Sequence, residues 1–179
     1  KLAGLDNICW PDPIASTKTP DGRFKLAQLV RANRELERVC RAYRLPCVSG
    51  KDSMKNDYGS GPDKISIPPT LLFSLFGDHP DVRKSATRDF KFAGDRIYLV
   101  GSSKQELGAS ELAFMLTESG EAAGVGGDVP RLLDPEENLN TYRSLAACVR
   151  AGWVRTAHDC SDGGVAVAHR GFASVRAAF

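Results

Sequence analysis

The chain has 179 residues, enough for one large domain or two small ones. Hydrophobic residues make up 42% and charged residues 26%, which is typical of a folded globular protein and excludes disordered, collagenous and coiled-coil classes. The 24 basic residues are scattered among 22 acidic ones, and the net charge of +2 argues against nucleic acid as the main partner. No apolar run approaches the roughly 20 residues that span a bilayer, so we expect no membrane segment.

Five cysteines occur without a CxxC pair, which argues against both a zinc site and a disulfide framework. We therefore expect free thiols in a protein of the reducing cytoplasm. The sequence begins at Lys1 rather than at a methionine, and its last helical stretch stops soon after it begins. From this we expect the chain to be a piece of a longer protein.

The first half of the chain predicts one helix and two strands. Residues 1–20 contain prolines and show no sustained periodicity, so they predict an irregular segment. Apolar residues then recur every three or four positions over 22–43, which predicts an amphipathic helix that ends before Pro46. A short strand is predicted to begin at Cys47 and run into a polar stretch, and a second strand is predicted over 65–77.

In the second half, the charged segment 78–93 is the predicted domain boundary. Residues 134–137 (DPEE) predict a helix start, because Asp can cap, Pro suits the first turn and early Glu favours the helix dipole. The other predicted elements are strands over 95–101 and 153–157, helices over 109–118 and from about 165, and a glycine-rich loop over 121–128. Strands that alternate with helices predict an α/β or α+β fold.

Two polar loops could carry chemistry: SGKDSMKND at 49–57 and HDCSDGG at 158–164. Phosphate recognition uses backbone N–H groups and a nearby lysine, and Lys51 supplies such a cation. Magnesium prefers hard oxygen ligands, which Asp159 offers ahead of the hydroxyl of Ser161. The first loop lacks the GxxxxGK[ST] spacing, so it is not a P-loop.

Each of these loop residues also has a structural explanation. Asp162 can be a plain helix cap, and His158 can satisfy a structural hydrogen bond instead of acting as a base. Lys51 and Asp52 can form a surface ion pair within a turn. On spacing alone, these alternatives stay open.

Several strings together resemble phosphoribosylformylglycinamidine synthases, also called formylglycinamide ribonucleotide amidotransferases, in the second half of their synthetase portion. SGKDSMKND is followed by KISIPPTLL and then by DVRKSATRDFKFAGDRIYLVG, and LDNICWPDP and DGRFKLAQLVRA lie just upstream. ELGASE at 106–111 is similar to the family's ELGGSE, with Ala109 in place of a glycine, and HDCSDGG is similar to its HDxSDGG loop. The agreement runs in order from about Leu5 to His169.

The resemblance implies an ATP- and Mg²⁺-dependent carbon–nitrogen ligase of purine biosynthesis. Such enzymes phosphorylate the amide oxygen of formylglycinamide ribonucleotide, and ammonia from glutamine then displaces phosphate from the iminophosphate. The products are formylglycinamidine ribonucleotide, ADP, phosphate and glutamate. Phosphorylation turns a poor leaving group into a good one, and magnesium stabilises the charge that develops.

The resemblance also implies a fold that is a tandem duplication of aminoimidazole-ribonucleotide-synthetase-like units. Residues 1–85 are then the C-terminal part of the second N-terminal-type, barrel-forming domain, and 88–179 are a truncated second C-terminal-type α/β domain. The implied partners are the first half of the synthetase and a glutaminase domain or subunit. A homodimer through exposed strand edges is also open.

Carried over residue by residue, Asp159 resembles a magnesium ligand and Ser161 a nucleotide contact of the long form of the enzyme. Gly50 falls where the short form contacts ATP, and Ser53 where it contacts the ribonucleotide. Lys51 falls where the short form has a metal-binding asparagine. A protonated lysine cannot ligate magnesium, so we place Lys51 with the nucleotide-binding residues instead.

No catalytic residue is expected in these 179 residues, because the family's catalytic histidine and main ATP loop belong to its first half. We therefore expect this chain alone to be inactive. One alternative is a catalytically silent half with an architectural role and an auxiliary nucleotide. Another is a different superfamily member, such as a selenophosphate synthetase or a thiamine-monophosphate kinase, against which SGKDSMKND argues.

Overall fold

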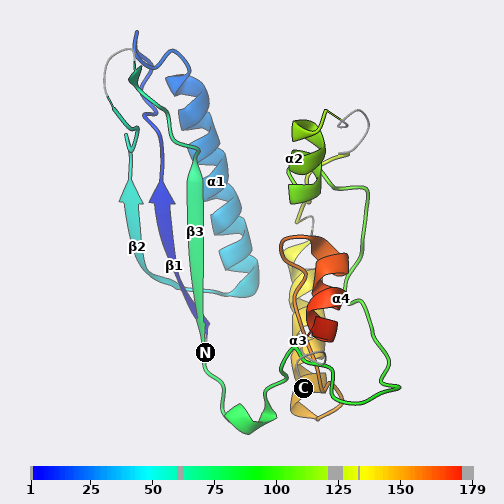
Figure 1. Cartoon of the computed structure of the whole chain (residues 1–179). Coiled ribbons are helices and arrows are strands. Elements are labelled where there is room, and N and C mark those ends of the chain that lie inside the picture. Colours follow the sequence, from blue (N-terminus) through cyan, green and yellow to red (C-terminus); the bar gives the residue numbers. More distant parts are fainter. Residues whose placement is uncertain (1, 60–62, 121–126, 133, 175–179) are drawn as a thin grey trace. The chain divides into compact units, whose positions relative to one another are not determined.

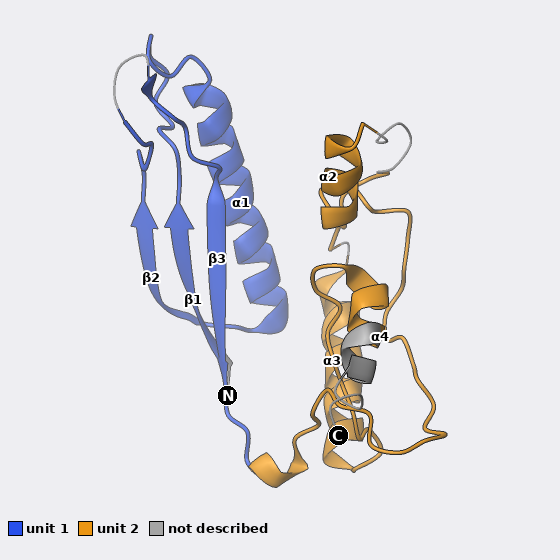
Figure 2. Cartoon of the chain, in the orientation of Figure 1, with its two compact units in different colours: residues 1–80 blue, residues 81–179 orange. Residues whose placement is uncertain are grey.

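The computed structural model describes residues 2–59, 63–120, 127–132 and 134–174. The chain divides into two compact units, Lys1–Pro80 (unit 1) and Asp81–Phe179 (unit 2), shown in Figure 2. The division falls inside the charged segment 78–93. Helices and strands are mixed, which confirms the α/β expectation. No helix in the described ranges is both long and apolar enough to cross a membrane.

Unit 1 is a three-stranded sheet with one long helix against it (Figure 1). Its strands are β1 (Leu2–Cys9), β2 (Cys47–Ser53) and β3 (Thr70–Gly77), in the order β2-β1-β3. The central strand β1 runs parallel to β2 and antiparallel to β3. The helix α1 (Gly22–Tyr43) makes the crossover between the two parallel strands, as a parallel pair requires.

The prediction of an irregular segment over 1–20 is wrong for its first part, because Leu2–Cys9 forms the central strand. Its inward positions include Gly4 and Ile8, both buried, but also Asp6, so the apolar alternation that marks a strand is broken. Pairing with neighbours on both sides creates the strand, and such pairing is not local in the sequence. A Cβ at Gly4 would lie 2.5 Å from the Phe73 ring, so this position needs a glycine.

The helix predicted over 22–43 is confirmed. It ends at Arg44, which takes a left-handed conformation (φ 51°) and donates its N–H to the carbonyls of Arg41 and Cys40. The indole of Trp10, only 4% exposed, lies against this helix and donates its Nε1–H to the carbonyl of Lys25 at 2.9 Å. Trp10 therefore fastens the end of β1 to α1.

The strand predicted from Cys47 is confirmed as β2. The next strand begins at Thr70 and not at residue 65, because Pro68 and Pro69 have no N–H to give to a sheet ladder. A buried ion pair holds the intervening segment: Lys64 Nζ lies 2.6 Å from the Asp57 carboxylate. Burial alone would raise the pKa of Asp57, but the hydrogen bonds from Lys64 and from the chain outweigh it and lower that pKa.

Unit 2 contains the predicted helices, here α2 (Glu111–Glu118), α3 (Pro135–Arg150) and α4 (Gly164–Ser174), and a short 3₁₀ helix at Val82–Lys84. The predicted cap of α3 is confirmed: the Asp134 carboxylate accepts the N–H groups of Glu136 and Glu137 at 2.9 and 3.0 Å. Ser110 caps α2 in the same way, by accepting the N–H of Ala113 at 3.2 Å.

The strands predicted over 95–101 and 153–157 are wrong, because the described residues of unit 2 form no strand. An isolated bridge joins Thr87 to Thr156. The apolar residues 97–100 are each more than half exposed. Their sequence is typical of a strand, but they pair with no other strand among the described residues. Most of the predicted glycine-rich loop, residues 121–126, lies outside the described residues.

Candidate functional site

Polar side chains gather where β1 and β2 end. The two strands are parallel, so their carboxyl ends, Cys9 and Ser53, lie at the same edge of the sheet and pair in register. Open α/β sheets bind ligands at this edge. We call the set Cys9, Lys51, Ser53 and Asn56 the β1–β2 polar cluster.

The cluster is held together by direct contacts. Lys51 Nζ donates to Ser53 Oγ at 2.7 Å and lies 3.5 Å from the sulfur of Cys9. Asn56 Nδ2 donates to Ser53 Oγ at 2.8 Å and to the Ser53 carbonyl at 2.9 Å. The Ser53 hydroxyl therefore receives two donors, and its own proton lies within reach of the Ile8 carbonyl at 3.3 Å.

Strand alternation decides on which face these side chains lie. Ile8, between Asn7 and Cys9, is 2% exposed and belongs to the face that packs on α1, so Cys9 projects from the opposite face. Lys51 pairs with Asn7, and Ser53 with Cys9, so both project from that same open face. The cluster thus stands on the sheet face that α1 leaves uncovered.

The chain that follows the cluster is tied to the core. Trp10 donates its backbone N–H to the Ser53 carbonyl at 3.0 Å, and its own carbonyl accepts the Asn56 N–H at 3.1 Å. Because the Trp10 indole is bonded to Lys25 of α1, these contacts connect the helix to the cluster. The positions of Ser53 and Asn56 therefore depend on the packing of the Trp10 indole against α1.

Gly50 does not join the cluster, because it pairs with Asp6 on the face toward α1. A Cβ at Gly50 would lie 2.3 Å from Asp6 Oδ1, so the carboxylate occupies the space of a side chain. A packing reason for glycine thus exists at this position. The assignment of Gly50 as an ATP contact stays a prediction.

The chemistry that the cluster offers is anion binding. It presents one ammonium group, one hydroxyl and one amide, which are donors suited to phosphate oxygens, and it contains no carboxylate. Among the residues that the structure describes, no group of three or more His, Cys, Asp or Glu side chains could hold a metal ion. Magnesium at this cluster would therefore have to come with a ligand that supplies its own oxygens.

The second predicted loop, in unit 2, forms a small network around Asp159. Ser161 Oγ donates to Asp159 Oδ2 at 2.6 Å, and His158 Nδ1 lies 3.1 Å from Oδ1. The hydrogen bond from Ser161 is the main cause that lowers the pKa of Asp159, so the carboxylate is ionised at neutral pH. Its side chain is 82% exposed, which suits the single carboxylate that a magnesium–nucleotide site commonly takes from a protein.

Glycines shape the turn after this network. Gly163 (φ 80°) and Gly164 (φ 61°) are left-handed, and a Cβ at Gly163 would lie 2.2 Å from the Val167 side chain. The Gly164 N–H donates to the Ser161 carbonyl at 2.9 Å as α4 begins. His158 also lines a cavity of about 430 Å³ in unit 2, whose other walls include Tyr98.

Sequence reasoning found Lys51 and Ser53 but missed Cys9 and Asn56. Asn56 lies in the polar loop 49–57, where an Asn three residues after a Ser is a signal for a local side-chain bond. Cys9 lies 42 residues before Lys51, and only the parallel register of β1 and β2 brings them together. A strand prediction for Leu2–Cys9 would have been needed to find it.

Comparison with known proteins adds the family. Residues 93–174 match the model of the AIR synthase related protein, C-terminal domain. The chain is 37% identical, over 88% of its length, to the phosphoribosylformylglycinamidine synthase subunit PurL of Anaeromyxobacter sp. (strain Fw109-5), and 33% identical, over 93%, to that of Deinococcus radiodurans. The chain is PurL-like, and its residues 93–174 belong to the AIR synthase superfamily. It spans about a fifth of the length of these relatives, 20% and 21%.

Only one of the two polar loops of this PurL-like chain lies within the residues that the family model matches. The Asp159 network lies inside the matched residues 93–174, whereas the β1–β2 polar cluster lies upstream of them. The similarity to the two PurL subunits extends over both. The resemblance described from the sequence motifs is thereby confirmed at the level of the superfamily.

Proposed function

We propose that this PurL-like chain is a fragment of a phosphoribosylformylglycinamidine synthase, from within the second half of its synthetase portion. The reaction is the ATP-dependent conversion of formylglycinamide ribonucleotide and ammonia from glutamine to formylglycinamidine ribonucleotide. The similarity to PurL subunits over 88–93% of the chain carries this proposal. Unit 1 then corresponds to the barrel-forming domain type, and unit 2 to the C-terminal domain type.

Within that function, the β1–β2 polar cluster takes the phosphate of a ribonucleotide. Lys51 supplies the charge and Ser53 a hydroxyl that two donors already orient, while Asn56 is a positioning residue that fixes Ser53. Gly50, on the opposite face of β2 from the cluster, keeps the ATP contact that the resemblance implies. The cluster has the ammonium group of Lys51 and no carboxylate, so it suits a phosphate and does not suit a bare cation.

In unit 2, Asp159 is assigned to Mg²⁺ and Ser161 to the nucleotide that accompanies it. Asp159 is ionised and exposed, and a magnesium ion would compete with the bonds from Ser161 and His158. The metal supplies charge stabilisation during phosphoryl transfer. The remaining partners are the rest of the synthetase and a glutaminase domain or subunit.

The test uses the complete synthetase, with ammonium chloride in place of glutamine so that glutaminase activity does not enter. Lys51→Ala should raise KM for formylglycinamide ribonucleotide about tenfold or more, since one charge-assisted contact is lost. Lys18→Ala, which removes an exposed lysine of unit 1 outside the cluster, is the matched control. Unchanged turnover in Lys51→Ala and Asp159→Ala, with lowered thermal stability, would instead support a silent architectural half.

A calorimetric titration of the present chain addresses the nucleotide directly. Saturable binding of ADP that requires Mg²⁺ and disappears in Asp159→Ala would support a nucleotide site in unit 2. Binding that persists in that variant would refute the assignment of Asp159. The control is Asp162→Ala, which changes a neighbouring carboxylate of the same loop.

A further inference from the structure

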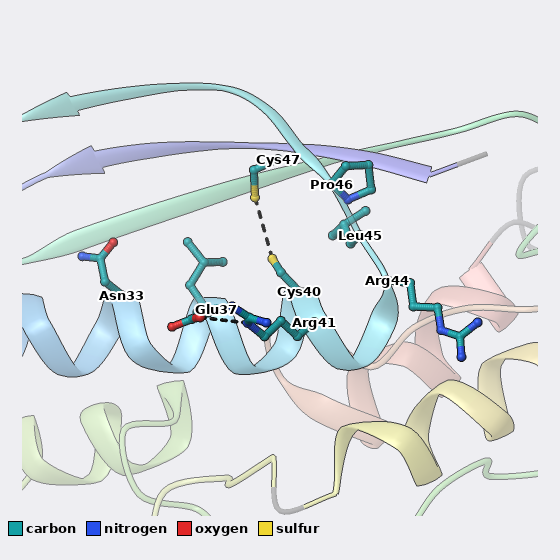
Figure 3. A pocket seen from close by; sticks show the side chains of 9 residues that line it. Asn33, Glu37, Cys40, Arg41, Arg44, Leu45, Pro46 and Cys47 are labelled. Atoms are coloured by element: carbon teal, nitrogen blue, oxygen red, sulfur yellow. Dashed lines mark hydrogen bonds and ion pairs between the residues drawn. The ribbon is translucent and has the colours of Figure 1, made fainter.

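Two of the five cysteines meet where α1 ends and β2 begins. Cys40 lies in the last turn of α1, Cys47 is the first residue of β2, and their sulfur atoms are 3.8 Å apart. Figure 3 shows the two side chains pointing toward each other across the gap between helix and strand. Both are free thiols, and Cys47 is the more exposed of the two.

The two sulfur atoms lie within reach of a covalent bond. Bonded sulfur atoms are about 2.05 Å apart, so the pair must close by about 1.8 Å, which rotation about the two Cα–Cβ bonds can supply. The chain between them is short and is held by two backbone hydrogen bonds: Leu45 donates its N–H to the Cys40 carbonyl at 2.9 Å, and the Pro46 carbonyl accepts the Gly4 N–H at 3.0 Å. The two thiols are therefore preorganised for reaction with each other.

The surroundings favour a small anionic thiol compound as reaction partner. The pair lies in the wall of an open groove of about 650 Å³ on unit 1. The charged residues of this groove are Glu37, Arg41 and Arg44; Arg41 donates to Glu37 at 2.8 Å (Figure 3), so the groove's net positive charge is that of Arg44. Glutathione disulfide carries a net negative charge, and its carboxylates suit guanidinium groups.

We propose that Cys47 is a thiol-modification site that reacts with low-molecular-weight disulfides of the glutathione class, and that Cys40 resolves the product to an internal Cys40–Cys47 disulfide. The Cys47 thiolate attacks one sulfur of the oxidised glutathione, forming a mixed disulfide and releasing one glutathione thiolate. Cys40 then loses its proton to solvent and attacks the Cys47 sulfur, which releases the second glutathione. Two protein thiols are oxidised and one disulfide of glutathione is reduced to two thiols, so the step is balanced.

The order of the two attacks follows from the environment of each sulfur. Cys47 is the more exposed residue, whereas burial, the hydrogen bond with Cys47 and the charges of Cys47 and Asp6 raise the pKa of Cys40 to about 11, so Cys47 is the thiol that reacts first. Once Cys47 is bonded to glutathione, the contributions of its thiol to the raised pKa of Cys40 are removed. The deprotonation of Cys40 then becomes easier, which favours resolution over hydrolysis or release.

The test maps thiols by mass spectrometry after the folded chain has been incubated with excess glutathione disulfide. Trypsin should yield the peptide of residues 39–41 linked to that of residues 45–51, and thiol titration should fall from five free groups to three. In Cys40→Ser, Cys47 should instead keep glutathione, about tenfold more than in the unaltered chain, because the resolving thiol has been removed. Cys148→Ser, the same substitution in α3, is the control and should leave the linkage intact.

Two results would overturn the proposal. One is a glutathione adduct on Cys47 that is as abundant in the unaltered chain as in Cys40→Ser, which would show that Cys40 does not resolve it. The other is a linked peptide that forms equally fast in concentrated urea, which would show that the fold contributes nothing. Because the mapping of the unaltered chain needs no variant, a failure of Cys40→Ser to fold would still leave the second comparison decisive.

Discussion

Replacing Trp10 by phenylalanine should destabilise unit 1 by about 2 kcal/mol. The indole is 4% exposed and donates its Nε1–H to the Lys25 carbonyl at 2.9 Å, a bond worth about 1 kcal/mol net. The smaller ring removes roughly 40 Å² of buried surface, which adds about 1 kcal/mol at 25 cal/mol per Å². The sum is a large share of the stability of a unit of about 80 residues.

Urea unfolding followed by circular dichroism measures this change, because α1 supplies much of the helical signal of unit 1. With a slope of about 1–1.5 kcal/mol per M, the midpoint should fall by about 1–2 M. Trp153→Phe is the matched control: its ring is 80% exposed, so its midpoint should shift by less than about 0.5 M. Equal midpoints for the two variants would refute the argument that Trp10 anchors the end of β1.

Three further predictions concern other named contacts. Asp134→Ala should lower stability by about 1 kcal/mol in thermal unfolding, while Asp134→Asn, which keeps the α3 cap, should change it little. The lowered pKa of Asp57 contributes stability that is present above about pH 4 and is lost as the pH falls through the folded pKa, so acid sensitivity should be smaller in Lys64→Met. Ser161→Ala should raise the pKa of Asp159 toward its ordinary value in an NMR titration, and an unchanged pKa would contradict the cause given above.

The helices of this chain could be predicted because each carries its signal locally. α1 shows a regular apolar period, and α3 shows an Asp–Pro–Glu–Glu start whose cap the structure contains. The strands could not be read equally well, since a strand exists only with a hydrogen-bonded neighbour. Residues 2–9 lack a periodic pattern yet are paired on both sides, whereas 97–100 have the pattern and no partner among the described residues.

The same contrast explains which site residues could be found. Asp159 and Ser161 lie two positions apart in one loop, so a hydrogen bond between them can be expected from the local sequence. Lys51 and Ser53 are likewise close in one strand, but the face from which they project depends on the inward position of Ile8 in β1. A misassigned strand therefore hides one side of a site even when the residues on the other side are correctly chosen.

Cys9 shows the consequence for function. If residues 1–20 were irregular, nothing in the sequence would place Cys9 near another site residue. In β1, Cys9 pairs with Ser53, and its sulfur lies 3.5 Å from Lys51 Nζ. A sulfur at this distance offers the ammonium only a weak acceptor, so Lys51 keeps most of its capacity to donate to an incoming phosphate. An aspartate at position 9 would satisfy the ammonium and repel the phosphate at once, and Cys9→Asp should therefore weaken ribonucleotide binding far more than Cys9→Ala does in the complete synthetase.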